Sequence, residues 1–237
     1  MDVIDCTKIF RAQKNTISWR DLQHRLASMT LHLLTVLLGF AFVSAITPGP
    51  NNLMLVASGV NFGFRRTVPH ILGITIGFPS MIFLVGLGVM QLFDLWPPSY
   101  VILKVLCVAY LLYLAWKVAN AAPPKEAQTE GRPLTFIQAA AFQWVNPKAW
   151  SMALSAITLY ATSRDLPAIL WVVGTFFVVS VISTTSWTVL GQQMQRFLKN
   201  PRALRKFNIF MAVLLVATLI PVLWLGDGWE FRGASVI

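Results

Sequence analysis

Charged residues are scarce in this chain. They make up 12% of its 237 residues, about half the share of a soluble globular protein. In contrast, 56% of the residues are hydrophobic, and the mean hydropathy is +0.65. The hydrophobic residues fall in long blocks, which is typical of membrane spans of about 20 residues each. This composition excludes a soluble domain and predicts an all-α integral membrane protein.

Cysteines and the usual signatures of catalysis are also scarce. Cys6 and Cys107 are the only cysteines, so the sequence offers neither a disulfide framework nor a CxxC metal-binding spacing. The apolar blocks contain no HExxH, no paired carboxylates and no Ser with His and Asp nearby. A membrane-embedded hydrolase or transferase would need one of these groups. We therefore expect no enzyme activity, no cofactor and no metal.

The charges that are present are mostly positive, with a formal net charge of +10. In a soluble protein this excess would indicate a nucleic-acid partner. Here the basic residues lie in short loops between apolar blocks, where Lys and Arg mark the cytoplasmic side. We therefore expect no nucleic-acid binding and place the odd-numbered loops in the cytoplasm. The basic residues of those loops are Arg65, Arg66, Lys117, Lys125, Arg132, Arg196, Lys199, Arg202, Arg205 and Lys206.

Residues 1–28 differ from the rest of the chain because they are polar and basic. They contain no apolar core of about 7 to 15 residues, so they are not a secretory signal peptide. Trp19, Leu22 and Leu26 recur at helical spacing and allow a short amphipathic surface helix. The alternative is that translation starts at Met29, which would also remove five basic residues from the predicted external side. The expected domains are this tail, an apolar membrane-embedded domain over 29–228 and a short C-terminal tail over 229–237.

Six apolar blocks predict six transmembrane helices. They cover about 31–58, 68–93, 100–118, 136–162, 167–190 and 207–225, with a polar linker over 120–133. Two halves of three spans must lie in the membrane with opposite orientation. The predicted architecture is therefore two inverted three-helix repeats.

The first predicted helix contains a polar break, formed by Thr47, Pro48, Gly49, Pro50, Asn51 and Asn52. Proline and glycine each destabilise a helix interior by about 1 to 3 kcal/mol. Broken backbone at membrane depth is tolerated only where protein or a water-filled cavity satisfies its polar groups. The break therefore predicts a lined cavity.

The fourth predicted helix carries a second break at Asn146, Pro147 and Lys148, where Pro147 aligns with Pro48. Each break falls in the first helix of a three-helix half. Interrupted segments at matching places in inverted halves indicate the binding site of a transporter.

These breaks predict a site for an anionic group. Where a helix restarts, its first N–H groups lack partners and carry partial positive charge. Pro50 suits the first position of such a helix, and Lys148 adds a full cation. We therefore expect the nine residues of the two breaks to hold the carboxylate of a small zwitterion. Two alternatives are that Lys148 only anchors its helix at the interface and that the kinks are architectural.

Several segments resemble the LysE/RhtB family of amino-acid exporters. They are the run over 46–53 (ITPGPNNL), the Gly-Phe-Arg-Arg run over 63–66 leading to Gly73, the run over 109–117 (AYLLYLAWK), and 146–148. The resemblance implies export of an amino acid or related metabolite through the bacterial inner membrane, coupled to the proton gradient.

Coupling to protons usually requires a titratable group within the membrane. His70, at the predicted start of the second helix, is one candidate, and Lys148 is the other. The alternative for His70 is an ordinary surface histidine at a helix start.

Two further functions stay open at this point: a structural or assembly membrane protein without a substrate, and a channel. Gly73 and Gly77 form a GxxxG pair, which we expect to serve close helix packing. Small-residue faces of this kind also permit a homodimer.

Overall fold

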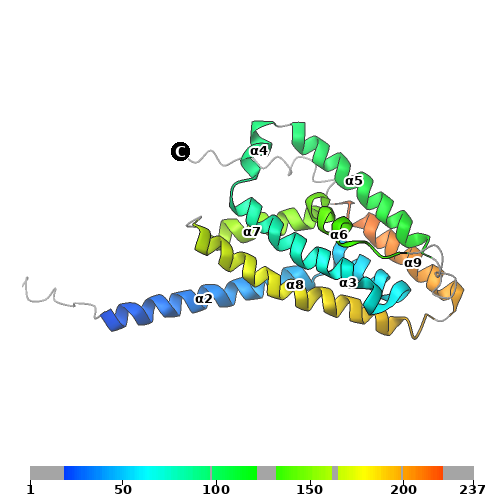
Figure 1. Cartoon of the computed structure of the whole chain (residues 1–237), viewed down its shortest axis with the longest axis horizontal. Helices are drawn as coiled ribbons and strands as arrows, with labels where there is room; N and C mark the ends of the chain where they lie inside the picture. Colours follow the sequence, from blue (N-terminus) through cyan, green and yellow to red (C-terminus); the bar gives the residue numbers. More distant parts are fainter. Residues whose placement is uncertain (1–18, 97, 122–131, 162–164, 199, 221–237) are drawn as a thin grey trace, which may run out of the picture. The chain divides into compact units, whose positions relative to one another are not determined.

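The computed structural model describes residues 19–96, 98–121, 132–161, 165–198 and 200–220, and this part of the chain is helical without a strand (Figure 1). The chain divides into two compact units, Met1–Val36 and Leu37–Ile237. In the first unit, the described residues form the beginning of one helix. The second unit holds both predicted breaks and the helices that follow them. The predicted C-terminal tail and most of the predicted linker lie outside the described residues.

The helices follow one another along the chain as eight α-helices and one 3₁₀ turn among the described residues. Their bounds are α2 (Trp19–Ile46), α3 (Pro50–Gly86), α4 (Met90–Leu95), α5 (Pro98–Ala119), α6 (Phe136–Phe142), η1 (Gln143–Val145), α7 (Pro147–Tyr160), α8 (Leu166–Met194) and α9 (Pro201–Ala217).

Helix α2 begins earlier than the sequence predicted. Its first residue is Trp19, so residues 19–28 continue directly into the first apolar block instead of forming a separate surface helix. The helical spacing of Trp19, Leu22 and Leu26 was therefore correct, but their assignment to a separate element was wrong.

Helix α3 is divided by a turn at Gly63. A straight helix of its 37 residues would be about 55 Å long, well beyond the roughly 30 Å hydrocarbon core of a bilayer. Gly63 has φ 75° and ψ 171°, a backbone conformation that glycine adopts without steric cost. The turn yields a first segment over 50–62 and a second over 64–86. The predicted loop between the first two spans is thus a tight turn at one glycine.

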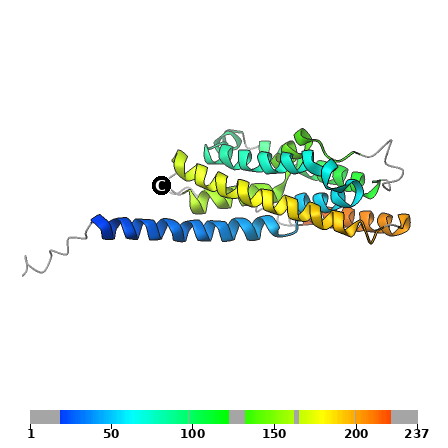
Figure 2. The same ribbon diagram turned by 60° about the horizontal axis from the view of Figure 1, so that its bottom comes forward.

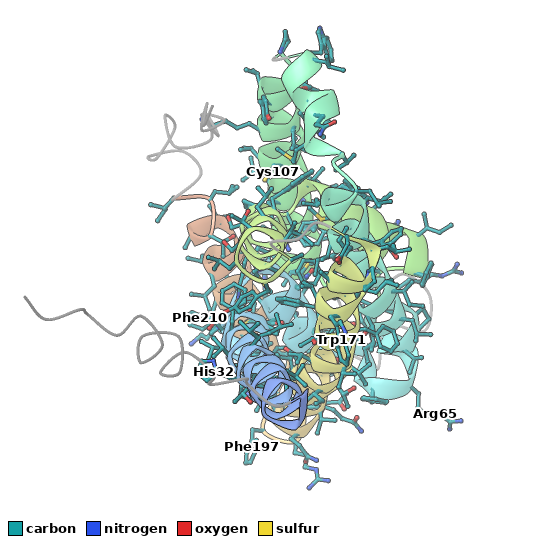
Figure 3. All side chains as sticks on the ribbon, turned by 90° about the vertical axis from the view of Figure 1, so that its left-hand side faces the viewer. His32, Arg65, Cys107, Trp171, Phe197 and Phe210 are labelled. Carbon is teal, nitrogen blue, oxygen red and sulfur yellow. The ribbon has the colours of Figure 1, made fainter. Side chains whose placement is uncertain are left out.

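Three of the described helices are long and apolar enough to cross a membrane: α3, α5 and α8. A shorter apolar stretch, His32–Ile46, belongs to α2. Large apolar side chains also face outward, as Trp171 of α8 and Phe210 of α9 show with 61% and 58% exposure (Figure 3). These features support an α-helical membrane protein, while the six-span inverted repeat stays a prediction.

Helices α3 and α8 pack side by side (Figures 1 and 2), and glycines set their separation. A Cβ atom on Gly59 would collide with the backbone of Thr188, and one on Gly191 would collide with the backbone of Val56. Small residues of this kind let membrane helices approach closely. The contact fixes α8 against the first segment of α3, which carries the first break.

The GxxxG pair of α3 packs against α6. A Cβ on Gly73 would lie 2.6 Å from Ala139 Cβ, and one on Gly77 would lie 2.7 Å from Ala140 Cα. This confirms the predicted role of the two glycines in close helix packing. It also brings α6, which leads into the second break, onto the helix that follows the first break.

Candidate functional site

The first break lies between the end of α2 at Ile46 and the start of α3 at Pro50. Pro50 occupies the first turn of α3, as predicted, since its missing N–H is not needed there. The N-cap residue is Gly49, and no side chain caps this helix end. The first N–H groups of α3 therefore keep their partial positive charge.

The Asn52 side chain spans the first break with two hydrogen bonds. Its Nδ2 donates to the carbonyls of Ala45 at 2.8 Å and of Thr47 at 2.9 Å. Ser183 of α8 also donates to the Ala45 carbonyl, at 2.9 Å. These bonds satisfy carbonyls that the end of α2 leaves without helical partners. Asn52 thus holds the break in shape.

The second break lies between α6 and α7 and is organised differently. The chain passes through η1, and Asn146 then caps α7 by accepting a hydrogen bond from the Lys148 N–H at 3.1 Å. Pro147 occupies the first turn of α7, just as Pro50 does in α3. The predicted alignment of Pro147 with Pro48 is therefore wrong by two residues, because Pro48 precedes its helix.

The two breaks contact each other through side chains. Asn51 Nδ2 donates to Gln143 Oε1 at 2.8 Å, and Gln143 Nε2 donates to Asn51 Oδ1 at 3.2 Å. Lys148 Nζ donates to the carbonyl of Thr47. The Lys148 ammonium group therefore points to the opposite break.

Gly49 makes room for Lys148. A Cβ at this position would lie 2.6 Å from Lys148 Cδ and 3.1 Å from its Nζ. The backbone of Gly49 is extended, with φ −169°, a conformation open to any residue. The absence of a side chain therefore matters here for the space it leaves.

A cavity of about 40 Å³ lies where the two breaks meet. One ordered water takes about 10 to 15 Å³ of such a volume, so the cavity has room for a few waters in this conformation. Its lining consists of Ser44, Ala45, Gly49, Asn51, Asn52, Ile74, Phe78, Asn146, Lys148, Ala149, Met152, Ser180, Ser183 and Thr184.

Five of the nine predicted site residues line this cavity: Gly49, Asn51, Asn52, Asn146 and Lys148. Thr47 contributes its carbonyl through the bond to Lys148. The three prolines, Pro48, Pro50 and Pro147, do not line the cavity, and Pro50 and Pro147 start the two helices instead.

Sequence reasoning missed the α8 wall of the cavity, formed by Ser180, Ser183 and Thr184. The sequence could have indicated this wall, because these three hydroxyl residues lie in a strongly apolar block. Gln143 of η1 does not line the cavity, but it is fully buried and bonded to Asn51.

The electrostatics of the cavity favour an anion. Among the described residues that line it, Lys148 is the single charged side chain, and no carboxylate is present. The uncapped N-terminus of α3 adds partial positive charge on the same wall. An ammonium group in apolar surroundings is costly unless it is paired, and Lys148 has no carboxylate partner among the described lining residues.

His70 lies elsewhere, and its predicted surface alternative is wrong. It is 1% exposed, inside the second segment of α3, and neither ring nitrogen has a hydrogen-bond partner among the described residues. It lines a second cavity together with Lys117. Within the described ranges, no group of three or more His, Cys, Asp or Glu side chains could hold a metal ion.

A family model described as LysE type translocator matches residues 31–220. The chain belongs to this family. The resemblance to LysE/RhtB exporters is thereby confirmed, and this LysE-family protein is a membrane transporter rather than an enzyme. The match covers both breaks and both cavities.

Curated relatives of this LysE-family chain include the cysteine/O-acetylserine efflux proteins of Escherichia coli strain K12 and of Shigella sonnei. Each is 29% identical over 199 residues, which cover 83% of this chain and 100% of the relative. No solved structure matches the chain.

Proposed function

We propose that this LysE-family transporter exports a small amino acid, of the cysteine or O-acetylserine class, across the bacterial inner membrane. The substrate class follows the names of the relatives, which match along their whole length. The direction of transport follows the same names.

The observation that carries the proposal is the cavity between the two breaks. It joins residues about 100 positions apart, as the bond between Lys148 and the Thr47 carbonyl shows. The substrate's carboxylate would bind Lys148 and the uncapped N-terminus of α3, because both present positive charge. Its ammonium would bind the Thr47 carbonyl just after α2, to which Lys148 now donates, and the hydroxyl of Ser183 nearby.

Transport requires this cavity to widen. A volume of about 40 Å³ takes a few waters but no whole amino acid. We propose that the six predicted spans form two inverted halves that move against each other and open the cavity to each side in turn. The equivalent positions of Pro50 and Pro147 at their helix starts support this pairing.

We further propose that the proton gradient drives export. Lys148 is the single titratable side chain among the described lining residues of this cavity. It can bind either a proton or, when protonated, the substrate's carboxylate. A protonophore added to energised cells should therefore stop export, whereas a sodium ionophore should not.

Mass spectrometry of the medium of bacterial cells that overproduce the chain tests the proposal. We expect one or a few amino acids, with O-acetylserine in the panel, to accumulate outside the cells. Lys148→Ala and Asn51→Ala should abolish the accumulation at matched membrane abundance. Lys104→Ala is the matched control, because Lys104 lies on α5 and lines neither cavity. No accumulation of any compound would contradict export, and accumulation that survives Lys148→Ala would contradict the site.

A further inference from the structure

A second cavity, of about 320 Å³, lies beside the far end of the first segment of α3. Ser58 and Asn61 of that segment line it, together with His70, Tyr113, Lys117 and Arg132. Its volume is about eight times that of the cavity between the breaks. It therefore has room for a whole small amino acid in the conformation described.

Two of the polar side chains in this cavity are already paired within the protein. Ser58 shares a 2.8 Å hydrogen bond with Thr67. Asn61 donates to Asn208 of α9 at 2.8 Å, and Asn208 donates back at 3.1 Å. The hydrogen-bond donors of Ser58 and Asn61 are thus used within the protein and are not available to an anionic ligand.

His70 is a buried polar group of this cavity without a hydrogen-bond partner among the described residues. It is buried, it lines the cavity, and neither of its ring nitrogens has a partner among the described residues. Buried polar groups in proteins nearly always have a partner, so an exception calls for a ligand or a water. A neutral imidazole offers one N–H donor to such a ligand.

The charges of the cavity select the ligand. Lys117 and Arg132 both line it, and no carboxylate does so among the described lining residues. Two cations and the imidazole N–H together suit an oxyanion, since each can donate a hydrogen bond to it. Tyr113, Trp116 and Phe62 supply apolar wall for a short side chain.

The first segment of α3 lines both cavities. Asn51 and Ser58 are seven residues apart in one helical segment, so they lie close to one face and about 10 Å apart along the axis. Asn51 lines the first cavity and Ser58 lines the second. The second cavity is on the Lys- and Arg-rich side, which the loop charges predict to be cytoplasmic.

We propose that this second cavity is a cytoplasmic loading site, in which Lys117, Arg132 and His70 hold the carboxylate of the substrate before it moves to the cavity between the breaks. The ligand's identity rests on the proposed function. The site itself rests on the unpaired imidazole and the two cations. Each chain would then bind two substrate molecules, one in each cavity.

Binding stoichiometry tests this assignment. The purified full chain in phosphatidylcholine nanodiscs is titrated with radiolabelled O-acetyl-L-serine and, separately, with L-cysteine. We expect two molecules bound per chain in the unaltered protein and in the control Lys104→Gln. One molecule should remain bound in the double variant Lys117→Gln/Arg132→Gln, and one in Lys148→Gln. O-acetylethanolamine, which lacks the carboxylate, should not displace the probe from either site.

The variants separate this inference from the proposed function. One bound molecule in the unaltered protein, lost in Lys148→Gln and kept in Lys117→Gln/Arg132→Gln, would overturn the loading site and leave the exporter intact. The reverse pattern would keep the second site and overturn the site between the breaks. No binding of either probe would overturn both assignments.

Two further measurements test whether the variants lose binding through misfolding and whether a lipid competes for the cavity. His70→Asn should lower the affinity of the second site for the probe at least tenfold. Arg132→Gln alone should also lower this affinity, and it should not disturb folding because Arg132 is exposed. Unchanged affinity in both variants would contradict the assignment. The titration is repeated in nanodiscs of phosphatidylglycerol, an anionic lipid. Loss of the second bound molecule there would show that an anionic lipid headgroup occupies the cavity in preference to the substrate.

Discussion

The reciprocal amide pair between Asn51 and Gln143 allows a direct test of whether the two breaks act as one unit. It consists of two hydrogen bonds, of 2.8 Å and 3.2 Å, between residues 92 positions apart. Asn51→Ala removes both bonds. Gln143→Ala removes both and also the 2.8 Å bond from Gln143 Nε2 to the Ala139 carbonyl. A double-mutant cycle isolates the part that depends on both side chains.

The expected coupling free energy is about 1 to 2 kcal/mol. Hydrogen bonds between membrane helices average about 0.6 kcal/mol each in such cycles and reach about 1.7 kcal/mol. Two bonds of good geometry therefore sum to slightly more than 1 kcal/mol, with an upper limit near 3 kcal/mol. Gln143→Ala should be the more destabilising single variant, because it also loses the Ala139 bond and leaves a cavity at a fully buried position.

Reversible unfolding in mixed micelles, followed over a titration with SDS, gives the free energy of unfolding for the two single variants and the double variant. Asn208→Ala combined with Asn51→Ala is the control pair, because Asn208 bonds to Asn61, about 15 Å further along α3. That pair should be additive within about 0.5 kcal/mol. A coupling between Asn51 and Gln143 within the same scatter would refute the claim that these side chains join the breaks.

Three further predictions concern glycines and one helix cap. Gly49→Ala should lower the export rate about tenfold or more, because the new Cβ would displace Lys148 from its hydrogen bond to the Thr47 carbonyl. Hydrogen bonds of charged groups contribute about 1.5 to 3 kcal/mol. Normal export at equal membrane abundance would refute this prediction. Gly59→Leu should destabilise the purified protein by about 1 to 3 kcal/mol and lower its melting temperature. Gly174→Leu is the control and should leave the melting temperature unchanged, because a Cβ at Gly174 would have nothing within 4 Å. Equal melting temperatures of the two variants would refute the α3–α8 contact. Asp165→Ala should destabilise by about 1 kcal/mol by removing the 2.8 Å cap bond from the Ala168 N–H, and unchanged melting would argue against that cap.

Local backbone chemistry made the two breaks predictable from sequence. Proline is favoured in the first turn of a helix, and the structure accordingly starts α3 at Pro50 and α7 at Pro147, although Pro69 and Pro79 lie inside α3. The close packing of Gly73 and Gly77 was predictable for the same reason, because their lack of a side chain has few other uses in an apolar helix.

Features that depend on tertiary placement were not predictable. The burial of His70 depends on how the second segment of α3 packs against the other helices, which the predicted loop between the first two spans did not indicate. The α8 hydroxyls reach the cavity because Gly59 and Gly191 let α8 approach α3. Until that contact is known, Ser183 is indistinguishable from any other hydroxyl in an apolar helix.

Efflux from proteoliposomes tests the central claim, that Lys148 holds the substrate's carboxylate between the breaks, most directly. Liposomes that contain the purified chain are loaded with radiolabelled O-acetyl-L-serine, and the initial efflux rate is measured under an imposed proton gradient. We predict saturable efflux by the unaltered protein and by Lys104→Gln, and a rate at least tenfold lower for Lys148→Gln. Saturable efflux of equal rate in Lys148→Gln would contradict the account.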